Sequence, residues 1–167
     1  HIRIGIMIEI PSMALMADLA AAEVDFASIG SNDLTQYVSA ADRMNPAVSS
    51  YYQSCSPAML RLLKGAFNAF SAQGKPISVC GEMAGDPKTA VLLAGLGARK
   101  LSMNPASLTG VKAALAQSSL AEAQELARQC LQMRTQKELL ECLNATLPHP
   151  GSGQEIPCRY KQDIEVA

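Results

Sequence analysis

The sequence contains no tryptophan, and aromatic residues make up only 4% of its 167 positions. Hydrophobic residues still reach 49%, so Ala, Leu and Met must build the core of one ordinary-sized domain, which suits helices packed on a sheet. Basic clusters are also absent, because the longest basic run is Arg99-Lys100 and the net charge is -1. Binding to nucleic acid through counterion release is therefore not expected.

The five cysteines are odd in number, and no two of them form a C-x-x-C pair. This pattern indicates neither a disulfide framework nor a zinc site, and predicts reduced thiols in a cytoplasmic protein. No apolar run reaches membrane-spanning length, so a membrane protein is not expected. The chain starts at His1, directly before a run typical of a buried strand rather than at a Met. We therefore expect a fragment of a longer protein.

Strand and helix signals alternate along the first part of the chain. The helix after the first strand is expected to place Leu15, Leu19 and Ala22 on one face. The clearest helix begins with Ser56 as its cap and Pro57 in its first turn. Four β-then-α units in a row imply an α/β fold with a parallel sheet. The four predicted strands are 3–9, 26–31, 76–80 and 100–103.

Two helices and a tail follow the βα units. Each of the two helices has an S/T-x-x-E capping box, Ser119 with Glu122 and Thr135 with Glu138. The last stretch has Pro, Gly and Ser early and charges late, which predicts weak structure. The sequence thus predicts three parts: the βα units in 1–117, the C-terminal helices in 118–147 and the tail in 148–167.

Side-chain parity adds a functional signal. Side chains alternate between the two faces of a strand. On one face of each predicted strand, the residues become small or polar toward the carboxyl end. Polar groups gathered at the carboxyl ends of parallel strands are typical of α/β active sites. The residues concerned are Glu9, Ser28, Gly30, Asn32, Ser78, Cys80, Ser102 and Asn104.

Three segments carry a family resemblance. They are Gly5-Ile-Met-Ile-Glu-Ile-Pro11, Ser28-Ile-Gly-Ser-Asn-Asp-Leu-Thr-Gln-Tyr37 with Ala41-Asp-Arg-Met-Asn-Pro46, and Cys80-Gly-Glu-Met-Ala-Gly-Asp-Pro87. Together they resemble the C-terminal, phosphoenolpyruvate-binding (PEP-binding) domain of enzyme I of the bacterial phosphotransferase system. Pyruvate phosphate dikinase and PEP synthase share the pattern, but the Ala-Asp-Arg and Gly-Glu-Met-Ala-Gly-Asp runs are closer to enzyme I. The resemblance covers roughly residues 2–131.

The resemblance implies that 1–117 is the C-terminal half of a (β/α)8 TIM barrel, since a full barrel has eight strands and about 250 residues. It further implies an enzyme that moves the phosphoryl group of PEP to its own histidine and on to a phosphocarrier protein for sugar uptake. The histidine and the phosphocarrier contacts belong to missing N-terminal domains, because neither His1 nor His149 lies in a Gly-rich Thr/Ser-His segment. The isolated fragment is therefore expected to be inactive.

Several alternatives stay open. The parent is either a stand-alone enzyme I or a multiphosphoryl transfer fusion, and a dikinase or synthase relative is a second possibility. A non-catalytic dimerisation module is a third, because the family dimerises through this domain. The open edges of a half-barrel also predict a homo-oligomer.

Two carboxylates are candidate metal ligands. Glu9 and Asp33 each end a predicted strand, and Mg2+ is commonly held by one or two carboxylates with substrate phosphate oxygens and water. The resemblance implies that both residues bind Mg2+. Glu9 is alternatively a solvated strand end, and Asp33 a helix N-cap, since Gln36 completes an Asp-x-x-Gln pattern.

Four residues are candidates for substrate binding. Asn32 can donate an amide hydrogen bond to a phosphate or carboxylate oxygen. Gly30 and Ser31 place backbone N–H groups near the same anion, although the family more often has Thr at the position of Ser31. Arg43 can grip an anion with two parallel hydrogen bonds. Without the motif, Arg43 would be interpreted as a surface arginine.

Cys80 is the candidate catalytic residue. Phosphoryl transfer from PEP leaves an enolate, and a proton must reach its methylene carbon. A thiol can supply it, because the reference pKa of cysteine is close to neutral pH. The resemblance implies this role for Cys80, whereas an isolated cysteine at a strand end is usually an inert buried residue.

Overall fold

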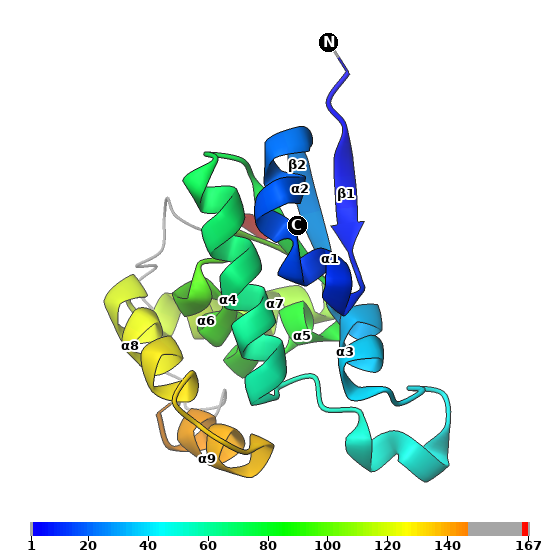
Figure 1. Ribbon diagram of the computed structural model, residues 1–167. Helices are drawn as coiled ribbons and strands as arrows, with labels where there is room; N and C mark the ends of the chain where they lie inside the picture. Colours follow the sequence, from blue (N-terminus) through cyan, green and yellow to red (C-terminus); the bar gives the residue numbers. More distant parts are fainter. Residues whose placement is uncertain (1, 147–164, 167) are drawn as a thin grey trace.

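The computed structural model describes residues 2–146 and 165–166, and has an α/β architecture (Figure 1). Five parallel strands form one sheet in the order β1-β2-β3-β4-β5. The predicted parallel α/β sheet is thus confirmed, and four of its strands come from the predicted βα units. The strands are β1 Gly5–Ile8, β2 Phe26–Gly30, β3 Ile77–Cys80, β4 Lys100–Ser102 and β5 Glu165–Val166.

Helices connect the strands and begin where the sequence supplies a cap. The Ser56 hydroxyl accepts from the Met59 N–H at the start of α4, and the Asp86 carboxylate accepts from the Thr89 N–H at the start of α6. The helices are α1 Pro11–Leu15, α2 Ala17–Glu23, α3 Ser31–Ser39, η1 Pro46–Tyr51 (a 3-10 helix), α4 Pro57–Ala72, α5 Glu82–Gly85, α6 Pro87–Leu96, α7 Pro105–Gln117, α8 Leu120–Cys130 and α9 Gln136–Thr146.

The two faces of the sheet differ as strand parity predicts. Ile8, Ile29, Val79 and Leu101 lie side by side across β1 to β4 and are fully buried. This apolar row belongs to the core that the helices cover, and Figure 1 shows α2, α4 and α6 in front of the sheet. The opposite face carries Met7 and Phe26 on β1 and β2, and small or polar residues toward the carboxyl ends of β2 to β4, so the sheet presents two different surfaces.

The first helical segment differs from the prediction. A break at Met16 separates α1 from α2, and the buried residues are Ala14, Ala17 and Ala21. Leu15 and Leu19, predicted to lie on the apolar face, are 73% and 60% exposed. Small alanine side chains let the helix backbone approach its neighbours closely, and this packing overrides the preference of the larger leucines for burial.

The C-terminal helices follow their capping signals. Ser119 and Glu122 form the predicted capping box at the start of α8, with both reciprocal hydrogen bonds present. Thr135 accepts from the Glu138 N–H before α9, but the Glu138 carboxylate accepts from the N–H of Arg134 instead.

The end of the predicted tail contains a short strand. Residues 147–164 and 167 lie outside the described residues, so the expected weak structure of 148–167 remains a prediction there. Residues 165–166 form β5, which pairs with β4. Such a short strand has too few residues to show a period-2 pattern, so the sequence did not indicate it.

Candidate functional site

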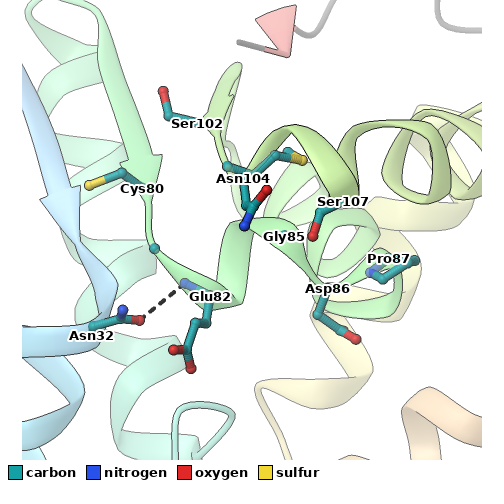
Figure 2. Close-up of a pocket in the computed structure, with 11 residues that line it drawn as sticks. Asn32, Cys80, Glu82, Gly85, Asp86, Pro87, Ser102, Asn104 and Ser107 are labelled. Carbon is teal, nitrogen blue, oxygen red and sulfur yellow. Dashed lines mark hydrogen bonds between the residues drawn. The ribbon is translucent and has the colours of Figure 1, made fainter.

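A pocket of about 730 Å3 lies at the carboxyl ends of β3 and β4. Figure 2 shows that its lining comes from the ends of β3 and β4, the short helix α5, and the first turns of α3, α6 and α7 with the residues that precede them. Carboxyl ends of parallel strands are where α/β proteins place their active sites. The lining residues are Asn32, Cys80, Gly81, Glu82, Gly85, Asp86, Pro87, Ser102, Met103, Asn104 and Ser107.

The Cys80 thiol lies at the edge of this pocket in a row of small residues. Gly30, Cys80 and Ser102 are register partners on β2, β3 and β4. The half-buried Cys80 thiol donates to the Ile29 carbonyl at 3.4 Å, and the Ser28 hydroxyl donates to Cys80 Sγ at 3.7 Å. The sulfur therefore has a defined position and remains reachable from the pocket.

A tight junction joins the end of β3 to the start of α3. The Ser31 hydroxyl donates to the Cys80 carbonyl at 2.7 Å, and Asn32 Oδ1 accepts from the Glu82 N–H at 3.1 Å (Figure 2). Gly81 between them has a φ of 103°, which favours glycine. A Cβ at Gly81 would lie 2.5 Å from Ser31 Oγ. Glycine here is thus needed both for its backbone conformation and for the close approach of α3.

Asp33 and Arg43 form an ion pair next to this junction. Arg43 Nη2 lies 3.7 Å from Asp33 Oδ1, and the two side chains are 38% and 41% exposed. The Arg43 N–H also donates to Gln36 Oε1 at 3.2 Å. The pair is open to solvent and its spacing is long, so both groups can exchange partners without a large cost.

Tyr52 lies in the loop after α3 and contacts this part of the site. Its hydroxyl donates to the Asn32 carbonyl at 3.1 Å. Burial raises the pKa of Tyr52 above its usual range, and the negative charge of Glu82 raises it further. The charge of Arg43, and side-chain hydrogen bonding with Thr35 and Arg43, act in the opposite direction. The tyrosine hydroxyl is thus bonded to Asn32 and is influenced by the charges of Arg43 and Glu82.

The Glu9 carboxylate lies against Gly30, immediately before α3. A Cβ at Gly30 would be 2.5 Å from Glu9 Oε1, so glycine makes room for this side chain. Asp33 is in the first turn of the same helix. The N-cap residue of this helix is Gly30, and no side chain caps the helix. The N-cap interpretation of Asp33 is therefore wrong. Among residues 2–146, no cluster of three or more His, Cys, Asp or Glu side chains is arranged to hold a metal.

Comparisons with known proteins identify the family. Residues 1–120 match the family described as "PEP-utilising enzyme, PEP-binding domain". The chain belongs to this family of PEP-binding domains.

In the described part of the chain, no helix has both the length and the apolar character needed to span a membrane.

Named relatives extend the comparison beyond the PEP-binding domain. The chain is 43% identical over 144 residues to the phosphoenolpyruvate-protein phosphotransferase of Buchnera aphidicola subsp. Schizaphis graminum, covering 86% of this chain and 25% of the relative. It is 46% identical over 136 residues to the multiphosphoryl transfer protein of Xanthomonas campestris pv. campestris, covering 81% and 16%. It is 46% identical over 140 residues to the phosphoenolpyruvate-protein phosphotransferase of Staphylococcus carnosus, covering 84% and 24%. The chain thus spans a quarter or less of these curated relatives.

The PEP-binding domain brings most of its predicted site residues together. Asn32 and Cys80 line one pocket, and Ser31 links them through its hydrogen bond to the Cys80 carbonyl. Glu9, Gly30, Asp33 and Arg43 lie outside the pocket lining, but Glu9 contacts Gly30 and Arg43 pairs with Asp33. The structure thus connects Asn32, Ser31 and Cys80 in one group, and joins Glu9 to Gly30 and Arg43 to Asp33 as two further pairs.

Sequence reasoning missed Tyr52 as a member of the site. It follows Asn32 by twenty residues and belongs to a loop without helical or strand periodicity. Asp86 and Ser107 also line the pocket without having been predicted as site residues. Asp86 belongs to the third motif but was given no role there, and for Tyr52 and Ser107 the sequence offers no positional signal.

Proposed function

We propose that this chain is the second half of the PEP-binding (β/α)8 barrel of a phosphoenolpyruvate-protein phosphotransferase. The observation that carries the proposal is the pocket at the strand ends, where Cys80 and Asn32 meet inside the matched region. Four βα units and a parallel sheet are what half of such a barrel requires. The names of the relatives favour a phosphotransferase over a dikinase or synthase.

Glu9 and Asp33 are the residues proposed to hold Mg2+. Both offer carboxylate oxygens, the ligand type that this hard cation prefers, and both lie at the start of α3. Two carboxylates suffice because substrate oxygens and water complete such a site. When bound, the cation would supply positive charge against the oxygens of the phosphoryl group in transfer.

The remaining residues act directly on the substrate. Asn32, with the backbone N–H groups near Gly30 and Ser31, is proposed to donate to PEP oxygens, and the Arg43 guanidinium to bind an anionic oxygen pair. Loss of the phosphoryl group leaves the enolate of pyruvate. Cys80 then donates its thiol proton to the methylene carbon of that enolate, which yields pyruvate and a thiolate that water re-protonates.

The rest of the reaction takes place outside this chain. A histidine of another domain is proposed to accept the phosphoryl group and to pass it to a phosphocarrier protein that serves sugar uptake in the cytoplasm. A parent that is a fusion with its own carrier domain is equally compatible, because one relative is named a multiphosphoryl transfer protein.

Pyruvate formation tests this proposal. The full-length enzyme with Mg2+ is expected to convert PEP to pyruvate in the presence of a phosphocarrier protein, followed with a coupled lactate dehydrogenase assay. The 167-residue chain alone is expected to give no pyruvate above background, because it lacks the acceptor histidine and the other half of the barrel. A full-length enzyme without PEP turnover would rule out the function, and turnover by the chain alone would rule out the half-barrel.

Self-association is a second expected property of the isolated chain. The sequence predicted two open sheet edges, and within the described residues the sheet ends in two edge strands, β1 and the two-residue β5. Of these, β1 is the longer edge. Exposed apolar side chains surround it, including Ile4 and Met7 at 67% and 46% exposure. Such an edge invites pairing with another chain, and closed twofold symmetry is the commonest outcome.

Light scattering at micromolar concentration is expected to give about twice the 17.7 kDa mass of one chain. Ile4→Lys places a charge on the edge and is expected to shift the mass to that of the monomer. Lys112→Glu on the exposed side of α7 serves as the control and is expected to leave the dimer intact. A wild-type chain that stays monomeric contradicts the proposal.

A further inference from the structure

The loop that carries Arg43 has few contacts with the sheet. Figure 1 shows residues 40–56 projecting away from the strands after α3. Its side chains are largely exposed, with Met44 at 80%, and several of its hydrogen bonds are local turns, such as Met44 N–H to Asp42 Oδ1 at 2.9 Å. A loop of this kind does not by itself hold an arginine in one orientation.

Tyr52 connects this loop to Asn32 at the start of α3. Its half-buried side chain reaches back to α3, where the hydroxyl donates to the Asn32 carbonyl at 3.1 Å. A tyrosine hydroxyl is protonated at neutral pH, so it can act as a donor to that carbonyl. The charge of Arg43 lowers the pKa of the same hydroxyl, which indicates that the guanidinium is near it. One hydroxyl thus bonds to Asn32 and lies near Arg43, and both residues are proposed to bind substrate.

Arg43 needs such support when the site is filled. In this structure its guanidinium pairs with Asp33, which is a proposed Mg2+ ligand. A carboxylate that binds a cation is a weaker partner for the guanidinium, because its charge is shared. The hydroxyl of Tyr52 is neutral and can keep its contact with Arg43 whether or not Asp33 binds the metal.

We infer that Tyr52 is a positioning residue, which fixes the Arg43 guanidinium relative to Asn32 so that both reach the anionic groups of PEP. This inference rests on the proposed function. A merely structural tyrosine would affect folding stability without a selective effect on substrate affinity, so kinetics can distinguish the two roles.

Tyr52→Phe in the full-length enzyme is expected to raise the KM for PEP about 3- to 10-fold, the effect of losing one or two hydrogen bonds, with kcat changed by less than about twofold. The ring remains in place, so loss of packing is avoided. Tyr51→Phe is the matched control, since Tyr51 is 66% exposed, and is expected to change neither constant. In an Arg43→Gln background, Tyr52→Phe is expected to add little, because it acts through Arg43.

A second measurement uses the 167-residue chain itself. The Arg43 Nε–H resonance in a 1H–15N spectrum is expected to shift and to exchange faster with water in Tyr52→Phe, but not in Tyr51→Phe. An unchanged Arg43 resonance, or a lower Tm with unchanged KM while Arg43→Gln does raise KM, would overturn the positioning role. A shifted resonance combined with unchanged KM in both Arg43→Gln and Tyr52→Phe would instead show that Arg43 does not bind PEP, which refutes its place in the proposed function.

Discussion

Cys80→Ala in the full-length enzyme is expected to lower the rate of pyruvate release about 10²- to 10⁴-fold, the range contributed by a positioned general acid. The thiol lies at the pocket edge, in the row formed with Gly30 and Ser102. PEP affinity is expected to change by only a few-fold, because the phosphate and carboxylate contacts are proposed to come from other residues. Rapid-quench measurement of pyruvate, with a separate titration of PEP binding, separates the two effects.

The environment of Cys80 makes alanine a clean substitution. The thiol is half-buried, donates to the Ile29 carbonyl and accepts from the Ser28 hydroxyl, so its removal leaves a small space that the pocket can fill with water. Cys142→Ala is the matched control, because Cys142 is also half-buried but belongs to α9, away from the pocket lining. Normal pyruvate release in Cys80→Ala would exclude Cys80 from the mechanism.

The sheet and the polar row could be predicted because they depend on local alternation. Short apolar strands separated by helices admit one economical arrangement, a parallel sheet. Parity then places Ser28, Gly30, Cys80 and Ser102 on one face, and the observed register agrees. The cap of α4 was predictable for a similar reason, since Ser56 bonds to an N–H three residues away.

Packing partners were harder to predict. Leucine is more hydrophobic than alanine, so an apolar face drawn through Leu15 and Leu19 is the natural expectation. Burial was decided instead by how closely the α1–α2 segment approaches its neighbours, which favours Ala14, Ala17 and Ala21. The same limit applies to Asp33, because helix α3 begins at Ser31 rather than after Asp33. That shift moves the carboxylate from the cap position into the first turn.

The contacts that loop residues make could not be predicted from the sequence. The hydrogen bond from Tyr52 to the Asn32 carbonyl depends on the path of residues 40–56, which no periodicity encodes. The positive φ of Gly81 could not be predicted either, because a Cys-Gly-Glu run does not by itself require a strained turn. Three-dimensional structure was needed to connect Tyr52 to Asn32 and Gly81 to the pocket lining.

The two aspartates near Arg43 differ in their surroundings. Asp33 lies in the first turn of α3, the helix whose N-cap residue Gly30 lies against the Glu9 carboxylate. Asp42 lies in the exposed loop, where its carboxylate accepts from the Met44 N–H at 2.9 Å. Asp33 is therefore the aspartate proposed to share a cation with Glu9, and Asp42 serves as its matched control.

Asp33→Ala in the full-length enzyme is expected to reduce activity by about 10²-fold or more, since electrostatic stabilisation by a bound metal is worth several kcal/mol and each 1.36 kcal/mol is about tenfold in rate. Asp42→Ala is expected to stay within about threefold, because it loses one exposed loop hydrogen bond. Assays over a range of Mg2+ concentrations provide the deciding measurement.

Asp33→Asn separates metal binding from the ion pair with Arg43. Asparagine keeps the shape and one oxygen but loses the charge, so half-maximal activation should need a higher Mg2+ concentration than in the wild type. If Asp33 served only to hold Arg43, the KM for PEP would rise and the Mg2+ dependence would not move. The loss of a negative charge from the first turn of a helix accounts for only about 0.3–1 kcal/mol of stability, too little to unfold a domain. Equal activity losses in Asp33→Ala and Asp42→Ala, with lower Tm in both, would therefore count against the metal site and indicate general damage to the α3 region.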